Sequence, residues 1–271
     1  TLQPSPPFFS SSSSSSFGLA YLEGIFLPFG YRAEDRLEIP GLPVNARWLE
    51  PPELTDWPKV FISELRVEEL PTEAAAICAA AVGNYYAPAG EASARVAGAI
   101  AAGDAQALAL LMEEPPWRAR FSMADEARLR EMAREEGANT SALEYLAWTL
   151  THGHRWNHLT LLVNTLGPDA PVGSLSQLNA LLRKDGFSLN PAAGEDGFTQ
   201  GSAAKKLAQS STVADSGLHT FGCGTTRAVP TAFLELIERH DGFRGFLGSN
   251  ARGIFDSTSG KAASKAGPQG F

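Results

Sequence analysis

The stretch from Trp148 to Asn164, WTLTHGHRWNHLTLLVN, constrains the fold of this chain more than any other. It contains three of the five histidines, and its second half alternates like a β-strand. Alternate side chains of a strand share a face, so one face would carry Leu159, Leu161 and Val163, and the other His158, Thr160 and Leu162. A histidine on a buried strand is held in a fixed position, as a metal site requires.

Two interpretations of these histidines remain open. A single histidine on a strand is more often a hydrogen-bonded core residue than a metal ligand. His152 and His154 are spaced to chelate an ion from one strand face, but Gly153 between them favours a loop. The stretch alone therefore does not establish a metal site.

The composition of the 271 residues indicates a soluble, globular protein with one large domain or two small ones. The net charge of -8 argues against a surface for nucleic acid or acidic membranes. Cys78 and Cys223 are too few for a disulfide framework, and we interpret both as small buried side chains in a reducing compartment. No apolar run approaches the roughly 18 residues of a transmembrane helix.

The domain organisation follows from shifts in composition. Residues 1–16 include an unbroken serine run from Ser10 to Ser16, which predicts a disordered leader. Residues 17–258 are predicted to form a single catalytic-type domain, with a helical insertion at about 71–150 whose charged faces are solvated. Residues 259–271 are expected to be a flexible tail.

The elements predicted on either side of the insertion have the same order. A helix from Leu19 to Gly30 precedes three short runs, RLEIP, NARWLEP and KVFISELRV, which are typical of antiparallel strands. After the histidine stretch, Ser174 is placed to cap a helix that ends at Gly186, and further strand-like runs follow. The expected fold is therefore α+β, with a helix packed on each of two small, mostly antiparallel sheets.

Four segments resemble one known family: WPKVFISELRVEELP, GHRWNHLTLLVN, LAQSSTVADS and AFLELIERHDGFRGFLGSNARGIFDSTS. The family is that of the 2-oxoadipate dioxygenase/decarboxylases, and its plant and algal members look most similar. The resemblance spans roughly residues 17–258. It implies a vicinal-oxygen-chelate-like half-open barrel of mostly antiparallel strands. It also implies an Fe(II) centre with two histidines and one glutamate, which converts 2-oxoadipate and O2 to 2-hydroxyglutarate and CO2 in lysine breakdown.

The resemblance assigns two metal ligands in this sequence. His158 matches the family's second histidine, which also lies against the substrate, and Glu235 in AFLELIER matches its carboxylate. The periodicity of Phe233, Leu236 and Ile237 by itself indicates an amphipathic helix over residues 231–240, in which the glutamates would be solvated. With the resemblance, we predict a strand instead, with Glu235 as the ligand and Glu238 paired to an arginine.

Substrate contacts are less clearly marked. Ser249 and Asn250, in GFLGSNARGIF, match the family's terminal loop beside the bound oxoacid, although a simple glycine-rich turn explains this segment equally well. Gln209 and Arg239 are weaker candidates for facing a carboxylate.

One departure from the family pattern concerns its first strand. Upstream of the segment resembling LAYLEGIFLPFGYR, the family carries an H-x-A-x-R strand with the first iron ligand and an arginine for the substrate carboxylate. This sequence has no histidine before His152, and serines stand at that place. We expect weak Fe(II) binding and an inactive chain as written, from a truncated 5′ region. His152, His154 or His219 would substitute only if a loop reached the site.

Two other functions remain open besides the dioxygenase. The chain could be a catalytically dead remnant that binds an oxoacid or a partner, or a Zn2+ or Mn2+ lyase or isomerase of the same superfamily. The expected partners are a small 2-oxo acid and O2, with no nucleic acid and no membrane. We expect a soluble intracellular protein, and the plant and algal likeness points to a plastid. The oligomeric state is left open.

Overall fold

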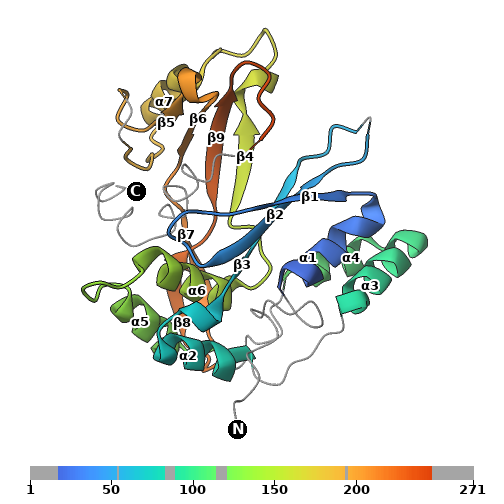
Figure 1. Cartoon of the computed structure of the whole chain (residues 1–271), viewed down its shortest axis with the longest axis vertical. Helices are drawn as coiled ribbons and strands as arrows, with labels where there is room; N and C mark the ends of the chain where they lie inside the picture. Colours follow the sequence, from blue (N-terminus) through green and yellow to red (C-terminus); the bar gives the residue numbers. More distant parts are fainter. Residues whose placement is uncertain (1–17, 54, 83–88, 114–120, 193–194, 246–271) are drawn as a thin grey trace. The chain divides into compact units, whose positions relative to one another are not determined.

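The computed structural model describes residues 18–53, 55–82, 89–113, 121–192 and 195–245, which fall into two compact units (Figure 1). Unit 1 comprises residues 1–155 and 220–226, and unit 2 comprises residues 156–219 and 227–271. The predicted leader, the predicted tail and the loop with Ser249 and Asn250 lie outside the described residues.

Unit 1 contains a three-stranded antiparallel sheet with one helix packed against it. The helix α1 (Leu19–Phe26) leads through a short 3-10 helix into β1 (Arg32–Leu37), β2 (Val44–Glu50) and β3 (Val60–Leu65), in the spatial order β1-β2-β3. Apolar residues on α1, including Leu22 and Phe26, pack on a core of Tyr31, Leu49 and Ile62. The predicted helix and the second and third predicted strands are confirmed, whereas the first strand lies earlier than the predicted RLEIP run, since β1 ends at Leu37.

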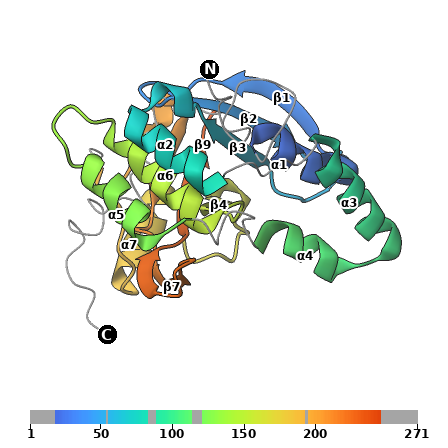
Figure 2. The ribbon, with the colours of Figure 1, turned by 90° about the horizontal axis from the view of Figure 1, so that it is seen from below.

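Between residues 72 and 152, the described part of unit 1 is mainly helical, as expected for the insertion. It contains α2 (Thr72–Val82), α3 (Ala89–Ala102), α4 (Ala105–Glu113), α5 (Met123–Met132) and α6 (Thr140–His152). In Figure 2, α3 runs beside α1 and is followed by α4. Ser122 forms a capping box with Asp125 at the start of α5, and Asn139 caps α6, so local sequence sets where these helices begin.

The described part of unit 2 contains a four-stranded sheet and one α-helix. The sheet has the order β4-β9-β6-β5, in which β4 and β9 are parallel and the other pairs are antiparallel. The helix is α7 (Leu175–Lys184), and the strands of this sheet are β4 (His158–Leu162), β5 (Gln200–Ser202), β6 (Leu207–Ser211) and β9 (Phe233–Arg239). A separate two-stranded sheet is formed by β7 (Ser216–Thr220) and β8 (Thr226–Pro230). The Ser174 side chain caps α7 as predicted, by accepting a hydrogen bond from Gln177 N.

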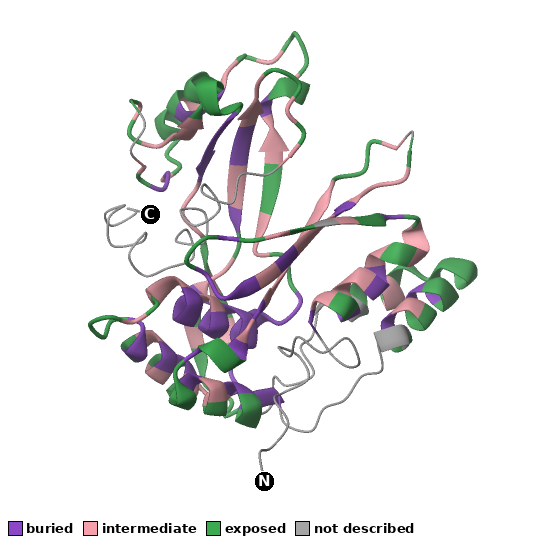
Figure 3. Ribbon diagram, viewed as in Figure 1, coloured by how far each residue is buried: buried purple, intermediate pink, exposed green. Residues whose placement is uncertain are grey.

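One face of the unit 2 sheet is buried under α7. The apolar cluster between them comprises Val163, Leu175, Leu178, Ala208 and Leu236. All five residues of β6 are buried, as the continuous purple strand in Figure 3 shows. The other face of the sheet is therefore the one on which polar side chains from β4, β6 and β9 come together.

For residues 231–240, periodicity predicted a helix and the family resemblance predicted a strand. The structure confirms the strand, β9, and the helical periodicity is misleading. The strand lies between β4 and β6, and its residues Phe233, Leu236 and Ile237 are buried from both faces. A strand that is apolar on both faces loses its alternation and can imitate the spacing of a helix.

Three further comparisons with the sequence complete the description of the fold. Of the strand-like runs expected after Gly186, the first forms only a single bridge, between Leu189 and Thr212. Mixed helices and mostly antiparallel sheets confirm the α+β class, and each unit repeats a helix followed by strands. Within the described ranges, no helix combines the length and the apolar character needed to cross a bilayer.

Candidate functional site

His158 and Glu235 are brought together by the parallel pairing of β4 and β9. His158 begins β4 opposite Phe233, and Thr160 lies opposite Glu235. Since side chains at alternate positions share a face, His158, Thr160 and Glu235 all project from the face opposite α7. The Nε2 atom of His158 lies 3.6 Å from Oε2 of Glu235.

The His158 ring has a defined setting. Its Nδ1 lies 2.6 Å from Oδ1 of Asn157, and the ring stacks on Phe233 with centroids 4.8 Å apart and planes 16° apart. Burial lowers the pKa of His158, while the neighbouring Glu235 acts in the opposite direction. A lowered pKa favours the neutral imidazole, the form that binds metal ions.

The Glu235 carboxylate is also anchored. Its Oε2 accepts a hydrogen bond of 2.6 Å from the Thr160 hydroxyl on the neighbouring strand. The side chains of His158 and Glu235 remain 23% and 13% exposed, so the described residues leave the pair partly accessible. A partly accessible pair of this kind is what an exchangeable ligand needs.

The pair fits two positions of a divalent metal site. The 3.6 Å between His158 Nε2 and Glu235 Oε2 is within the reach of two bonds of about 2 Å to one ion. An imidazole nitrogen and a carboxylate oxygen suit Fe(II) and other first-row divalent metals. Among the described residues, no group of three or more His, Cys, Asp or Glu side chains is placed to hold a metal, so any metal site in this part of the chain would have this pair as its protein ligands.

The other histidines weighed from the sequence are on other elements than β4 and β9. His152 is the last residue of α6 and packs on Trp148 with ring centroids 4.7 Å apart. His154 is buried in unit 1 and stacks on Tyr21, and His219 lies on β7.

Gln209 and Arg239 share the sheet face of Glu235. Gln209 is buried on β6 opposite Ile237, two residues along β9 from Glu235. Arg239 lies two residues further along β9, and its Nη1 donates hydrogen bonds to the carbonyl oxygens of Phe243 and Gly245. The structure thus lines up four of the predicted site residues on one face, whereas Ser249 and Asn250 are not described.

Glu238 has a different partner from the arginine that we predicted. It projects from the opposite face of β9, where its Oε2 accepts a 2.8 Å hydrogen bond from the backbone N–H of Leu175. This N–H belongs to the first turn of α7, and helix N-termini attract negative charge. The prediction of an arginine partner is therefore wrong, and Glu238 stabilises the start of α7.

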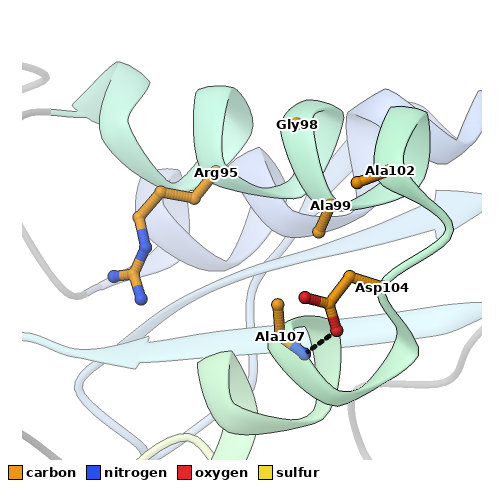
Figure 4. A pocket seen from close by; sticks show the side chains of 6 residues that line it. All are labelled: Arg95, Gly98, Ala99, Ala102, Asp104 and Ala107. Atoms are coloured by element: carbon orange, nitrogen blue, oxygen red, sulfur yellow. Dashed lines mark hydrogen bonds between the residues drawn. The ribbon is translucent and has the colours of Figure 1, made fainter.

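A hollow of about 310 Å³ lies in the helical block of unit 1 (Figure 4). Its lining comes from α3, α4 and the turn between them, namely Arg95, Gly98, Ala99, Ala102, Asp104 and Ala107. The Asp104 carboxylate accepts a hydrogen bond from Ala107 N and so caps α4. No candidate residue of the metal pair borders this hollow, and we assign it no chemistry.

The sequence interpretation missed three residues that contact the pair: Asn157, Thr160 and Phe233. Asn157 and Thr160 flank the histidine within NHLT, so their proximity was visible in the sequence. The role of Thr160 was not visible, because its contact with Glu235 depends on pairing between strands that are 75 residues apart.

Comparison with known proteins identifies several relatives. A family model of 2-oxoadipate dioxygenase/decarboxylase matches residues 12–240. The chain is 30% identical over 268 residues to the chloroplastic/amyloplastic 2-oxoadipate dioxygenase/decarboxylase of Oryza sativa subsp. japonica, covering 90% of this chain and 65% of that protein. It is 32% identical over 233 residues to the chloroplastic enzyme of the same name from Arabidopsis thaliana, covering 82% of this chain and 55% of that protein.

A solved structure supports the same relationship. It is that of the hydroxyglutarate synthase from Oryza sativa in complex with 2-oxoadipate, which matches with a TM-score of 0.66 and 28% identity. The match covers 91% of this chain and 78% of that one. The chain spans between about half and two thirds of the length of the two plant relatives.

Proposed function

The chain belongs to the 2-oxoadipate dioxygenase/decarboxylase family, and from that premise we propose that it carries the metal-binding half of a site for oxidative decarboxylation of a 2-oxo diacid. The reaction consumes one O2 and converts 2-oxoadipate to 2-hydroxyglutarate and CO2. The observation that carries the proposal is the His158–Glu235 pair, with its ligand atoms 3.6 Å apart on a partly accessible sheet face.

His158 and Glu235 would hold Fe(II) through Nε2 and Oε2. When bound, the iron would template the 2-oxo acid and activate O2. The protein's own contribution is to keep the imidazole neutral by burial and to fix both ligand atoms, so that little reorganisation is needed when the ion binds. His158 would also lie against the substrate, because both occupy the same open face.

The far end of the substrate would extend along the sheet. Gln209 and Arg239 lie two and four residues beyond the level of Glu235. With about 3.3 Å per residue, these levels are roughly 7 and 13 Å away. The Gln209 amide is thus at the right level for the distal carboxylate of a six-carbon diacid, while Arg239 would add positive charge beyond it. We propose that Ser249 and Asn250 complete the substrate contacts.

A third protein ligand is part of the proposal, since two ligands hold Fe(II) more weakly than three and orient an oxoacid poorly. In the family pattern that ligand is the histidine of an H-x-A-x-R strand, and its arginine pairs with the substrate carboxylate. We expect the printed sequence by itself to have low activity. The plastid location of the plant relatives and a role in lysine breakdown extend to this protein as proposals.

O2 uptake tests the proposal, measured with 2-oxoadipate and Fe(II) added anaerobically before O2 is admitted. The chain and a version with an H-x-A-x-R strand added ahead of residue 17 are compared, and CO2 release is recorded in parallel. We expect the extended version to consume O2 and release CO2 in equal amounts.

Single substitutions in the extended version make the test specific. His158→Ala and Glu235→Gln should each abolish uptake, whereas Glu238→Gln, on the same strand but the opposite face, should retain it. Full activity in either ligand variant would contradict the proposal. Conversion without O2 would instead favour a lyase or isomerase, and a folded chain that binds oxoacid without turnover would favour the remnant.

A further inference from the structure

Two side chains that bind no substrate in the proposed function contact the metal pair directly. Asn157 contacts the ring of His158, and Thr160 contacts the carboxylate of Glu235. We infer that Asn157 and Thr160 are positioning residues, which hold the lone pairs of the two ligands toward one shared point before any ion arrives. The inference rests on the proposed function, because it assumes that His158 and Glu235 are metal ligands.

Asn157 sets the tautomer of His158. Its Oδ1 can only accept a hydrogen bond, so at 2.6 Å it requires the proton to be on Nδ1 of the imidazole. In the neutral ring the lone pair is then on Nε2, the atom that lies 3.6 Å from Glu235 Oε2. The opposite tautomer would present an N–H to the carboxylate and could not bind a metal through that nitrogen.

Phe233 restricts the same ring from its face. The two rings are nearly parallel, 16° apart, with centroids separated by 4.8 Å. The stack opposes rotation of the imidazole about its bond to Cβ, while the Asn157 contact acts in the plane of the ring. The ring is therefore fixed in both respects that metal binding requires, its orientation and its tautomer.

Thr160 does for the carboxylate what Asn157 does for the ring. Its position directly opposite Glu235 in the parallel register brings the hydroxyl to 2.6 Å from Oε2. This is the same oxygen that approaches His158, so one lone pair is used by Thr160 and Oε2 is kept on the histidine side. A glutamate without this contact would lose conformational entropy on binding the ion, which would weaken the site.

Cobalt titration tests the role of Thr160, since Co(II) substitutes for Fe(II) in sites of this type and is stable in air. The metal-free chain is titrated with Co(II), and binding is followed by the visible absorption of the ion. Changes to residues that orient metal ligands typically cost about 10- to 100-fold in metal affinity. We expect Thr160→Val to weaken binding by about 10-fold, and Thr160→Ser, which keeps the hydroxyl, to restore most of it.

A matched control separates this role from general loss of a threonine hydroxyl. The Thr165 hydroxyl in the same unit donates a 2.7 Å hydrogen bond to Leu162 O and does not touch the pair. Thr165→Val should therefore leave the Co(II) affinity within about twofold of the unsubstituted chain. Equal affinity of Thr160→Val and the unsubstituted chain would overturn the inference, while Co(II) binding that survives His158→Ala would overturn the proposed metal site itself.

The role of Asn157 is tested without any metal, by NMR of the imidazole nitrogens in nitrogen-labelled protein above neutral pH. We expect His158 in the metal-free chain to carry its proton on Nδ1, and Asn157→Ala to give a mixture of tautomers. Asn164→Ala is the control. The side chain of Asn164 forms hydrogen bonds with the backbone N–H and carbonyl oxygen of Arg239 rather than with the ring of His158. An unchanged tautomer in Asn157→Ala would overturn the role of Asn157, whatever metal binding shows.

Discussion

The carboxyl group of Glu64 on β3 should make unit 1 less stable as the pH rises from about 4.5 to about 7. Burial, reinforced by the nearby Glu68, raises the pKa of Glu64 to about 7, against the lowering effect of a hydrogen bond from Leu19 N. The perturbation that isolates this effect is Glu64→Gln. The substitution removes the titrating group and retains an amide oxygen that can accept from Leu19 N.

The sign and size of the effect follow from proton linkage. Between the ordinary pKa of 4.5 and the folded pKa of about 7, the folded chain binds more protons at Glu64 than the unfolded chain. The free energy of unfolding therefore falls as the pH rises across this window. Each pKa unit corresponds to about 1.4 kcal/mol, so the full shift would give roughly 3 kcal/mol. Solvent reaching the carboxyl reduces this, and we expect about 1–3 kcal/mol.

Urea unfolding at pH 5 and pH 8 measures the prediction. The unsubstituted chain should lose about 1–3 kcal/mol more than Glu64→Gln between the two pH values. Glu53→Gln is the control, since that side chain is 82% exposed and should leave the pH dependence close to that of the unsubstituted chain. Identical pH profiles for Glu64→Gln and the unsubstituted chain would refute the reasoning.

Three predictions concern unit 2. Leu236 is fully buried between the sheet and α7, so Leu236→Ala should lower the free energy of unfolding by about 2–5 kcal/mol in urea, and a loss below about 1 kcal/mol would contradict this packing. Ser210→Ala leaves the buried Asn179 Oδ1 without its 2.7 Å hydrogen bond and should lower the free energy of unfolding by about 1–3 kcal/mol. Thermal unfolding measures this loss, and an unchanged midpoint temperature would contradict the prediction. Glu238→Gln weakens the interaction with Leu175 N and should lower the free energy of unfolding by about 0.3–1 kcal/mol at low ionic strength. An unchanged free energy of unfolding at every salt concentration would contradict this prediction.

The features that sequence reasoning predicted well depend on local chemistry. Ser174 caps α7 because its side chain accepts from a backbone N–H three residues later, which involves only neighbouring residues. The strand at His158 was visible because β4 is at the edge of its sheet, where apolar and polar positions still alternate. Elements of this kind can be found from periodicity alone.

The features that failed depend on contacts between distant segments. On β9, burial from both faces removed the alternation, so that periodicity indicated a helix and the resemblance was needed to predict a strand with Glu235. The pairing of Thr160 with Glu235 joins residues 75 positions apart, and no local pattern sets that register. Glu238 was wrongly assigned an arginine partner. Its actual partner is the backbone N–H of a residue at the start of α7, which is distant in sequence and which no local pattern indicates.

The central claim is that His158 and Glu235 hold the metal at which O2 and a 2-oxo diacid react, and isotope labelling tests it most directly. The extended version of the chain, with the added H-x-A-x-R strand, is supplied with Fe(II), 2-oxoadipate and oxygen-18-labelled O2. The masses of the products are then measured by mass spectrometry. We predict that both heavy atoms enter 2-hydroxyglutarate, one in its new carboxylate and one in its hydroxyl, that the CO2 is unlabelled, and that His158→Ala and Glu235→Gln give no product. Unlabelled 2-hydroxyglutarate, or labelled product from either variant, would contradict the account.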